Sequence, residues 1–451
     1  MVGDRLIPLG SQIRPLWSPR KNMSLRYAKS EEFLERARKT IPLGAQTFSK
    51  SVTQYPFGVS PYFVSRGKGS KIWDVDGHQY IDFINGLCSV TLGYADPDVN
   101  AAVTAQLEDG SIFTLSHPLE TEVAELLCEV VPSAEMVRFG KNGSDATAGA
   151  IRVARAFTGR DHVLVCGYHG WQDWYIGSTA RNKGVPQATR DLTHGFTYND
   201  LSALEKALTD HKGQVAAVIM EPMNVVAPTP GYLESVKALT HAAGALLVFD
   251  ETITGFRYAL GGAQELFGVI PDLTTLGKGI ANGFPLSAVC GRGDVMREME
   301  EVFFSFTMGG ETLSLAAAKA TIGKLKREPV IATMNERGSR ILAEVPKLID
   351  KHGIGHFASV SGHPTWSFLV FKDIDGTSAF EIKTLWMQEM MERGLLSFGS
   401  HNLSYSHSEA DVDALLAAYE AIFPILRQAV DNRAIRQYLK CEPLEPLFRV
   451  R

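Results

Sequence analysis

Six short apolar runs, spaced along residues 136–291, constrain the fold of this chain more than any other feature. Each run has the length of a buried strand, and helical segments such as residues 144–157 and 232–244 lie between several of them. Apolar strands that alternate with helices favour an α/β architecture whose mostly parallel sheet is buried on both faces. The predicted strands are residues 136–139, 162–167, 215–220, 245–250, 273–277 and 286–291.

The pattern differs on both sides of this region. Residues 1–25 are rich in Pro, Ser and Arg and predict an arm, and residues 30–40 predict a helix with Ser30 as its N-cap. An alternating segment around Asp76-Gly77 predicts a hairpin. After residue 330, a smaller α+β domain is predicted, with a strand over residues 365–371 and amphipathic helices over residues 331–352, 379–394 and 409–430.

These patterns divide the chain into four expected parts. We expect an N-terminal arm and a segment that joins the small domain, a large domain that carries the binding site, a small C-terminal domain and a tail. Their expected bounds are residues 1–75, 76–330, 331–430 and 431–451.

Composition narrows the function classes. The formal net charge of -5 gives no reason to expect nucleic acid or an anionic membrane as a partner. The five cysteines are scattered and odd in number, which is typical of a reducing compartment, so we expect a cytoplasmic protein. No apolar run reaches the roughly 18 residues of a membrane span. No segment has metal-ligand spacing, so no metal is expected.

Three segments end predicted strands with polar residues, where open α/β sheets bind ligands. They contain Asp250-Glu251, Lys278 between two glycines, and Gly143-Ser144 at the start of a helix. Taken singly, each has a plain interpretation as a turn former, a solvated charge or a helix N-cap. A nucleotide loop is not favoured, because residues 277–283 have the wrong spacing for G-x-G-x-x-G and Lys278 is not followed by Ser or Thr.

The combination of the three segments points to pyridoxal 5'-phosphate. This cofactor needs a lysine amine for a Schiff base, a carboxylate against its ring nitrogen and a cradle for its phosphate. Lys278, Asp250 and the Gly143-Ser144 turn provide one candidate for each task. A helix N-terminus suits the phosphate, because its free N–H groups and dipole favour an anion.

Five ordered motifs carry a family resemblance: RGKGSKIWDVDGHQYIDF, MVRFGKNGSDATAGAIRVARAFTGRD, GYHGW, LLVFDETITGFR and GGAQELFGVIPDLTTLGKGIANGFPLSAVCGR. The sequence resembles the class III (ω-) aminotransferases, which are fold-type I pyridoxal phosphate enzymes, over roughly residues 30–430. Within that family it is most similar to the glutamate-1-semialdehyde aminomutase group. The resemblance implies a large domain with a mostly parallel sheet, a smaller α+β C-terminal domain and an aminotransferase activity.

The resemblance also implies roles for single residues. The catalytic residues would be Lys278, which forms the Schiff base and moves a proton, Asp250 at the ring nitrogen, and Glu221 near the substrate. Thr307 would reach the phosphate from the neighbouring subunit, which implies a homodimer with the active site at its interface. The other cofactor-binding residues would be Gly143, Ser144 and Asp145 at the phosphate, Tyr168 stacked on the ring, and His169 beside it.

Departures from the family pattern bear on the substrate. The loop over residues 223–226 is short, Glu311-Thr312 replaces the usual Asn-Pro, and residues 395–411 differ from the aminomutase pattern. These changes favour a transaminase that uses glutamate as donor and an aldehyde or ketone as acceptor. The runner-up is a glutamate-1-semialdehyde 2,1-aminomutase that forms 5-aminolevulinate.

Two questions stay open at this level. Trp171, Trp174 and Tyr175 either line a pocket for a larger, carbohydrate-like acceptor or only pack the loop that carries them. A catalytically silent binding protein with the same fold is disfavoured, because Lys278 and Asp250 are both present. A nicotinamide-dependent dehydrogenase is disfavoured by the missing G-x-G-x-x-G.

Overall fold

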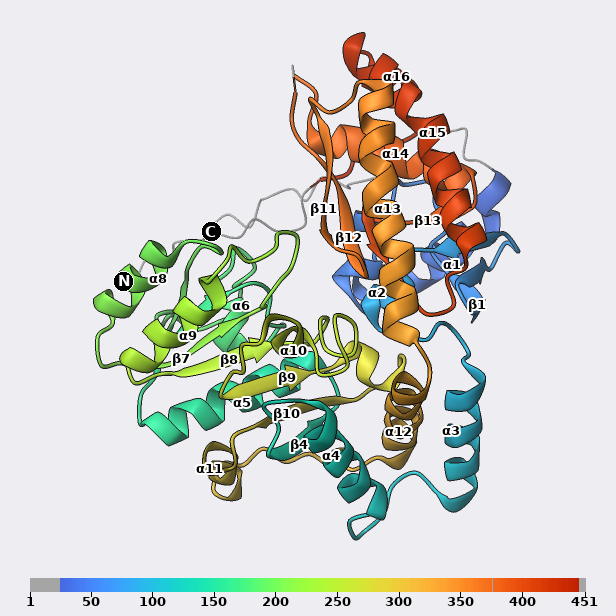
Figure 1. Cartoon of the computed structure of the whole chain (residues 1–451). Coiled ribbons are helices and arrows are strands. Elements are labelled where there is room, and N and C mark those ends of the chain that lie inside the picture. The colour runs from blue at the N-terminus through green and yellow to red at the C-terminus, as the bar shows by residue number, and fades with distance from the viewer. Residues whose placement is uncertain (1–24, 375, 446–451) are drawn as a thin grey trace, which may run out of the picture.

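The computed structural model describes residues 25–374 and 376–445, so most of the predicted arm and the end of the predicted tail lie outside the described residues. Figure 1 shows one lobe built around a central sheet and a second lobe in which the N-terminal segment lies against the C-terminal helices. Within the described part of the chain, no helix is long and apolar enough to cross a membrane.

The central sheet has seven strands in the order β4-β10-β9-β8-β7-β5-β6. All neighbours from β9 to β6 are parallel, while β10 is antiparallel to both β9 and β4. The predicted mostly parallel α/β sheet is therefore confirmed. The strands are β4 (Met136–Gly140), β5 (His162–Cys166), β6 (Thr193–Gly195), β7 (Val215–Met220), β8 (Leu246–Asp250), β9 (Leu273–Leu276) and β10 (Ser287–Gly291).

All six predicted strands are present, and the edge strand β6 was missed. Its three residues are Thr193, His194 and Gly195, so it has no apolar run that could signal a strand. Strands β7, β8, β9 and β10 bury both faces. Alternate residues of β8 pack against different helices. Val248 packs in a cluster with α5 residues such as Ile151, whereas Leu247 packs in a cluster with α8 and α9 residues such as Leu204.

The helices of the first lobe cover the sheet and its edge (Figure 1). Helix α12 contacts both α3 and α4. The helices of this region are α3 (Pro97–Asp109), α4 (Pro118–Val130), α5 (Gly143–Thr158), α6 (Asp173–Ile176), α7 (Gln187–Arg190), α8 (Leu201–Asp210), α9 (Tyr232–Ala242), α10 (Ala263–Phe267), α11 (Gly293–Met296) and α12 (Thr312–Arg327).

In the second lobe, N-terminal and C-terminal segments of the described chain pack together. The strand β3 pairs in parallel with β13, although more than 300 residues separate them in the sequence. One large apolar cluster joins N-terminal residues such as Tyr27 and Tyr80 to C-terminal ones such as Trp386. The N-terminal elements are α1 (Ala28–Arg38), β1 (Val64–Lys68), β2 (Lys71–Asp74), β3 (Gln79–Asp82) and α2 (Asn85–Cys88).

The C-terminal elements are α13 (Val330–His352), β11 (Ala358–His363), β12 (Trp366–Phe371), α14 (Ala379–Glu392), β13 (Leu395–Leu396), β14 (Ser400–Asn402), α15 (Glu409–Asp431) and α16 (Ile435–Tyr438). The predicted strand over residues 365–371 and the three long helices are confirmed. The β2–β3 hairpin crosses the predicted boundary after residue 75. The division into four parts stays a prediction.

The prediction of Ser30 as a helix N-cap was wrong. Helix α1 starts two residues earlier, at Ala28, and Ser30 lies in its first turn. The cap comes from the hairpin turn instead, because the Asp76 carboxylate accepts hydrogen bonds from the backbone N–H groups of Lys29 and Ser30 at 2.8 and 3.0 Å. A distant carboxylate satisfies these free N–H groups in a way that local sequence does not reveal.

Candidate active site

The carboxyl ends of β8 and β9 bring Asp250 and Lys278 to the same edge of the sheet. Asp250 is the last residue of β8 and is paired in register with Thr275 of β9, three residues before Lys278. Lys278 then opens the 3-10 turn over residues 278–281. Both residues therefore lie where a parallel sheet holds its ligands.

The Asp250 carboxylate is buried and accepts four hydrogen bonds, three of them at one oxygen. His169 Nδ1 donates to one oxygen at 2.8 Å, and the other accepts from the Thr252 hydroxyl at 2.5 Å, the Thr252 N–H at 3.1 Å and the Thr275 hydroxyl at 3.1 Å. Burial raises the pKa of this carboxyl, but the hydrogen bonds from His169 and Thr252 outweigh it. The pKa of Asp250 is therefore below its ordinary value, and the group stays ionised.

Lys278 has a strained backbone. Its φ of +43° lies in the left-handed region that a lysine rarely adopts. Two glycines allow the close packing around it, since a Cβ on Gly279 would lie 2.4 Å from Thr91 Oγ1 and one on Gly277 would lie 3.1 Å from Thr252 Cγ2. Such strain is typical of functional positions, because the surrounding structure must hold the residue in place.

Helix α5 presents its N-terminus to the site. Asn142 and Asp145 form a capping box, in which the Asp145 carboxylate accepts from the N–H groups of Lys141 and Asn142. The N–H groups of Gly143 and Ser144 are in the first turn and have no partner within the helix. The Ser144 hydroxyl accepts from Trp171 N at 3.2 Å, and its own hydrogen donates to none of the described residues.

A second carboxylate lies at the end of the next strand. Glu221 follows β7, and its Oε2 accepts from Tyr168 N at 3.0 Å and from Asn224 Nδ2 at 3.1 Å. Burial raises the pKa of Glu221, and the nearby charge of Asp250 raises it further. The short loop over residues 223–226 thus folds back onto the carboxylate through Asn224.

The aromatic segment after β5 divides into two kinds of residue. Tyr168 and Trp171 are exposed, with 64% of the Trp171 surface accessible, whereas Trp174 and Tyr175 are buried in the cluster that contains α5. The interpretation that all three of Trp171, Trp174 and Tyr175 line a pocket is therefore wrong. Trp174 and Tyr175 pack the loop, and Trp171 alone of the three presents a free ring face.

Thr307 lies apart from the other predicted site residues. It is exposed on the segment over residues 301–311, which packs against α5 and β4 through Phe304, whose carbonyl accepts a hydrogen bond from Arg138. The departure at Glu311 has a structural role here, because Glu311 caps α12 and pairs with Lys141 at 3.0 Å.

The structure thus brings together Lys278, Asp250, His169, Tyr168, Glu221 and the start of α5. Sequence reasoning missed Thr252, Thr275 and Asn224, which hold the two carboxylates. Thr252 follows Asp250 by two residues, but Thr275 becomes visible only when β8 and β9 are placed side by side in register.

The comparisons with known proteins agree with this geometry. A family model for aminotransferase class-III matches residues 54–402. The chain belongs to the class III aminotransferases. Enzymes of this family use pyridoxal phosphate, and the described residues fit it: an ionised buried carboxylate, a lysine, and two free N–H groups with a hydroxyl at a helix N-terminus.

Individual relatives span nearly the whole chain. One is the 3-aminobutyryl-CoA aminotransferase of Cloacimonas acidaminovorans (strain Evry), with 33% identity over 86% of this chain and 95% of that protein. Another is glutamate-1-semialdehyde 2,1-aminomutase 2 of Brevibacillus brevis, with 34% identity over 87% and 98%. Among solved structures, the FumI protein of Sphingopyxis sp. MTA144 in its PLP internal aldimine form is similar, with 28% identity, a TM-score of 0.83 and coverage of 92% and 99%.

Proposed function

We propose that this enzyme transfers an amino group from an amino acid donor, such as glutamate, to an aldehyde or ketone acceptor. The observation that carries the proposal is the buried, ionised Asp250 at the end of β8, beside the strand that leads to the strained Lys278. An ionised carboxylate against a pyridine nitrogen makes the cofactor ring an electron acceptor, and a lysine amine can attach the cofactor and move a proton.

Each site residue then has a task. When bound, pyridoxal phosphate supplies a ring that accepts the electrons left when the donor loses its α-proton. Asp250 keeps a proton on the ring nitrogen, and His169, Thr252 and Thr275 keep Asp250 ionised and oriented. Lys278 would carry the covalent attachment and move the proton, which makes it the general base and acid of the reaction.

Binding falls to the remaining residues. The N–H groups of Gly143 and Ser144, together with the Ser144 hydroxyl, would donate to the phosphate at the N-terminus of α5. We assign Asp145 to this turn through its capping role, because its carboxylate is already engaged. Tyr168 would cover the ring with its exposed aromatic face, and Glu221 would lie near the reacting part of the substrate.

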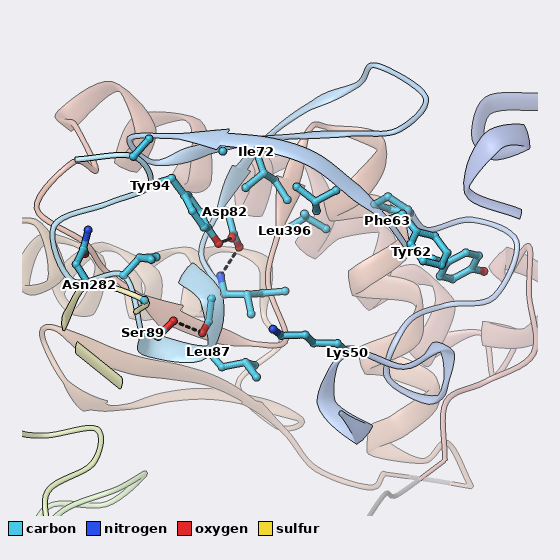
Figure 2. Close-up of a pocket in the computed structure, with 18 of the residues that line it drawn as sticks. Lys50, Tyr62, Phe63, Ile72, Asp82, Leu87, Ser89, Tyr94, Asn282 and Leu396 are labelled. Carbon is cyan, nitrogen blue, oxygen red and sulfur yellow. Dashed lines mark hydrogen bonds between the residues drawn. The ribbon is translucent and has the colours of Figure 1, made fainter. Parts of the chain in front are cut away.

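An adjoining cavity supports an acceptor with a negative group. A pocket of about 640 Å³ is lined by residues 282–285, which follow Lys278, and by Leu87 and Ser89, which flank Cys88. Lys50 is the one basic residue in its lining, and Figure 2 shows its amine pointing into the pocket on the side of Leu87. The buried Asp82 nearby is engaged by other donors, since it accepts from the Tyr94 hydroxyl at 2.6 Å and from the Ile84 N–H at 2.8 Å.

Lys50 can be tested with matched acceptors. We expect Lys50→Gln to raise KM at least about tenfold for an aldehyde that carries a carboxylate, since a charge-assisted hydrogen bond contributes about 1.5–3 kcal/mol. KM for a neutral aldehyde of similar size should stay unchanged. An equal rise in KM for both acceptors would show that Lys50 shapes the pocket but does not bind a negative group on the acceptor.

We further propose a homodimer whose interface completes the site. Exposed apolar side chains gather on two segments that hydrogen bonds hold together, since Thr312 N donates to Ser111 O at 3.0 Å. Exposed apolar surface of this kind marks a protein interface. Thr307 lies between members of this patch, which are Ile112, Phe113, Leu115, Phe303, Phe306 and Met308.

The dimer proposal predicts that loss of the dimer also weakens cofactor binding. We expect Phe303→Asp to shift the protein to a monomer in sedimentation experiments and to weaken cofactor binding, because Thr307 would no longer reach a partner's phosphate. Thr307→Ala should weaken cofactor binding while the dimer persists. A fully active monomer would contradict the proposal.

The donor and the reaction type can be separated by two half-reactions. Amino acids are screened against the cofactor-loaded enzyme by the loss of its visible absorption band, and we expect glutamate to bleach it. The pyridoxamine form is then incubated with glutamate-1-semialdehyde. Formation of 5-aminolevulinate at a rate comparable to transamination would favour the aminomutase, the alternative that the Brevibacillus brevis relative supports.

The location of the enzyme is part of the same proposal. Cys88, Cys128, Cys166 and Cys290 form no disulfide, as suits a reducing compartment, and the cytoplasm remains our prediction. The carbohydrate-like acceptor also stays a prediction, with Trp171 as the ring that would stack on it.

A further inference from the structure

Three histidines from separate parts of the chain meet at the outer edge of the central sheet. His162 starts β5, His194 lies in the edge strand β6, and His211 follows the last residue of α8. One ring nitrogen from each histidine can be chosen so that all three lie within 4.8 Å of one another. All three residues are partly buried, so each ring is partly covered by the protein and still accessible to solvent.

The rings are arranged around a short nitrogen–nitrogen contact. His162 Nδ1 lies 2.9 Å from His194 Nε2, and the His211 ring stacks on both neighbours with centroid separations of 4.8 and 3.8 Å. Two nitrogens that share one tetrahedral ion at about 2.0–2.1 Å lie about 3.3 Å apart. A small outward movement of the first two rings and a rotation of the third would therefore create a three-nitrogen site.

The charge state of the cluster suits a metal ion. Burial and the neighbouring rings lower the pKa of His194 to about 4 and lower the pKa of His162 below its ordinary value. Neutral imidazoles are the form that binds metals, because each keeps a free lone pair. Asp161 and Asp191 favour a positive charge near the first two rings, while Arg155 opposes it near His162.

Packing of the three rings without an ion leaves this arrangement without a reason. The only side-chain hydrogen bond of the cluster among the described residues is the one between His162 and His194, and no carboxylate orients any of the rings. The His211 ring has no side-chain hydrogen-bond partner among the described residues, although it stacks on both other rings. An ion at their centre would satisfy all three and tie the edge strand β6 to β5 and to the end of α8.

We propose that His162, His194 and His211 together bind one divalent transition-metal ion of the Zn²⁺ or Ni²⁺ class, with water completing its coordination. Imidazole nitrogens suit these ions. On binding, the proton that the donating ring holds in the His162–His194 hydrogen bond moves to the other nitrogen of the same ring, which frees the lone pair for the ion with no net loss of a proton. The site lies at the start of β5, whereas Tyr168 follows the end of that strand and Asp250 is the last residue of β8, so we assign the metal site a structural role. The expectation of no metal rested on local spacing, which cannot detect ligands 32 and 17 residues apart.

Zinc titration of the untagged, cofactor-loaded enzyme tests the site. We expect calorimetry with ZnCl₂ alone to show one Zn²⁺ per chain and a higher thermal unfolding midpoint with added Zn²⁺. His194→Gln and His211→Gln should each weaken Zn²⁺ binding at least tenfold and abolish the rise in midpoint. His356→Gln, which removes an exposed histidine elsewhere, should leave both unchanged.

Transaminase activity should differ little between these variants, which separates this site from the cofactor site. His211 caps the exposed end of a helix, so His211→Gln should keep the fold, as far-ultraviolet circular dichroism would verify. Two outcomes would overturn the proposal. The wild type could take up no Zn²⁺ at a large molar excess, or His194→Gln and His211→Gln could both bind it as tightly as the wild type.

Discussion

The two sides of the candidate site are built in different ways. On the cofactor side, Asp250 is buried and receives four hydrogen bonds from residues on or directly after strands. On the proposed acceptor side, Trp171 is exposed and Lys50 ends a short 3-10 turn of the N-terminal segment. The buried strand ends thus set the class of chemistry, while the loops are free to set the substrate.

Among changes on the cofactor side, Lys278→Ala should have the largest effect on activity. We expect transaminase activity to fall by a factor of about 10⁴ or more, because both the covalent attachment and the proton transfer are lost. The variant should still bind pyridoxal phosphate, but treatment with borohydride should leave no cofactor covalently attached to the protein, as mass spectrometry of the reduced protein would show.

Lys319→Ala is the matched control for this loss. It removes a lysine of similar size that pairs with Glu122 on the surface, and its activity should stay near that of the wild type. If Lys278→Ala kept more than a few per cent of the activity, Lys278 could not be the residue that moves the proton.

Asp250→Asn tests the network that surrounds the carboxylate. Activity should fall on the order of a thousandfold, because a preorganised charge is lost. The free energy of unfolding should fall by about 3 kcal/mol, since His169 and the threonines would face an amide that accepts fewer hydrogen bonds. Urea titration of the cofactor-free protein measures the second effect.

The pH dependence of that stability difference has a defined sign. Because the folded pKa of Asp250 lies below its ordinary value, the difference should be complete above the ordinary aspartate range. The stability difference between the wild type and Asp250→Asn should disappear as the pH falls through the lower pKa of Asp250 in the folded protein. A difference that was already lost at mildly acidic pH would mean that the carboxyl is protonated in the folded protein.

The contrast between the two sides also explains how far the sequence could be interpreted. Sequence reasoning found Lys278, Asp250 and Gly143-Ser144, because each lies at or just after the end of an apolar strand or at the start of a helix. Such local patterns can be recognised from the sequence alone. Thr275 could not be assigned, because its contact with Asp250 depends on the register of β8 against β9.

Contacts between distant segments were hidden for the same reason. The Asp76 cap of α1 joins residues almost 50 positions apart, and the three-histidine cluster draws on three separate elements. The aromatic residues Trp171 and Trp174 look alike in the sequence. Only packing against α5 shows that the second of them belongs to the core.

Trp174→Ala and Trp171→Ala sharpen the comparison within one segment. Trp174 is 8% exposed, so its removal should cost about 3–5 kcal/mol of unfolding free energy. Trp171→Ala should change stability by less than about 0.5 kcal/mol and act on KM for the acceptor instead. Equal stability losses would show that the exposed ring is also part of the packing.

A small effect of the opposite sign is expected for Glu221→Gln, which tests whether the second carboxylate resembles Asp250. Burial and the charge of Asp250 hold the pKa of Glu221 above its ordinary value, so ionised Glu221 destabilises the fold. The neutral glutamine can still accept from Tyr168 N, and we expect a gain on the order of 1 kcal/mol in unfolding free energy at neutral pH.

The gain should shrink as the pH falls through the raised folded pKa of Glu221 and vanish below the ordinary glutamate pKa, where both proteins carry a neutral side chain. Urea titrations of both proteins across this pH range measure it. A variant that is less stable than the wild type at neutral pH would show that the site stabilises a second negative charge, and Glu221 would then belong with Asp250 on the cofactor side.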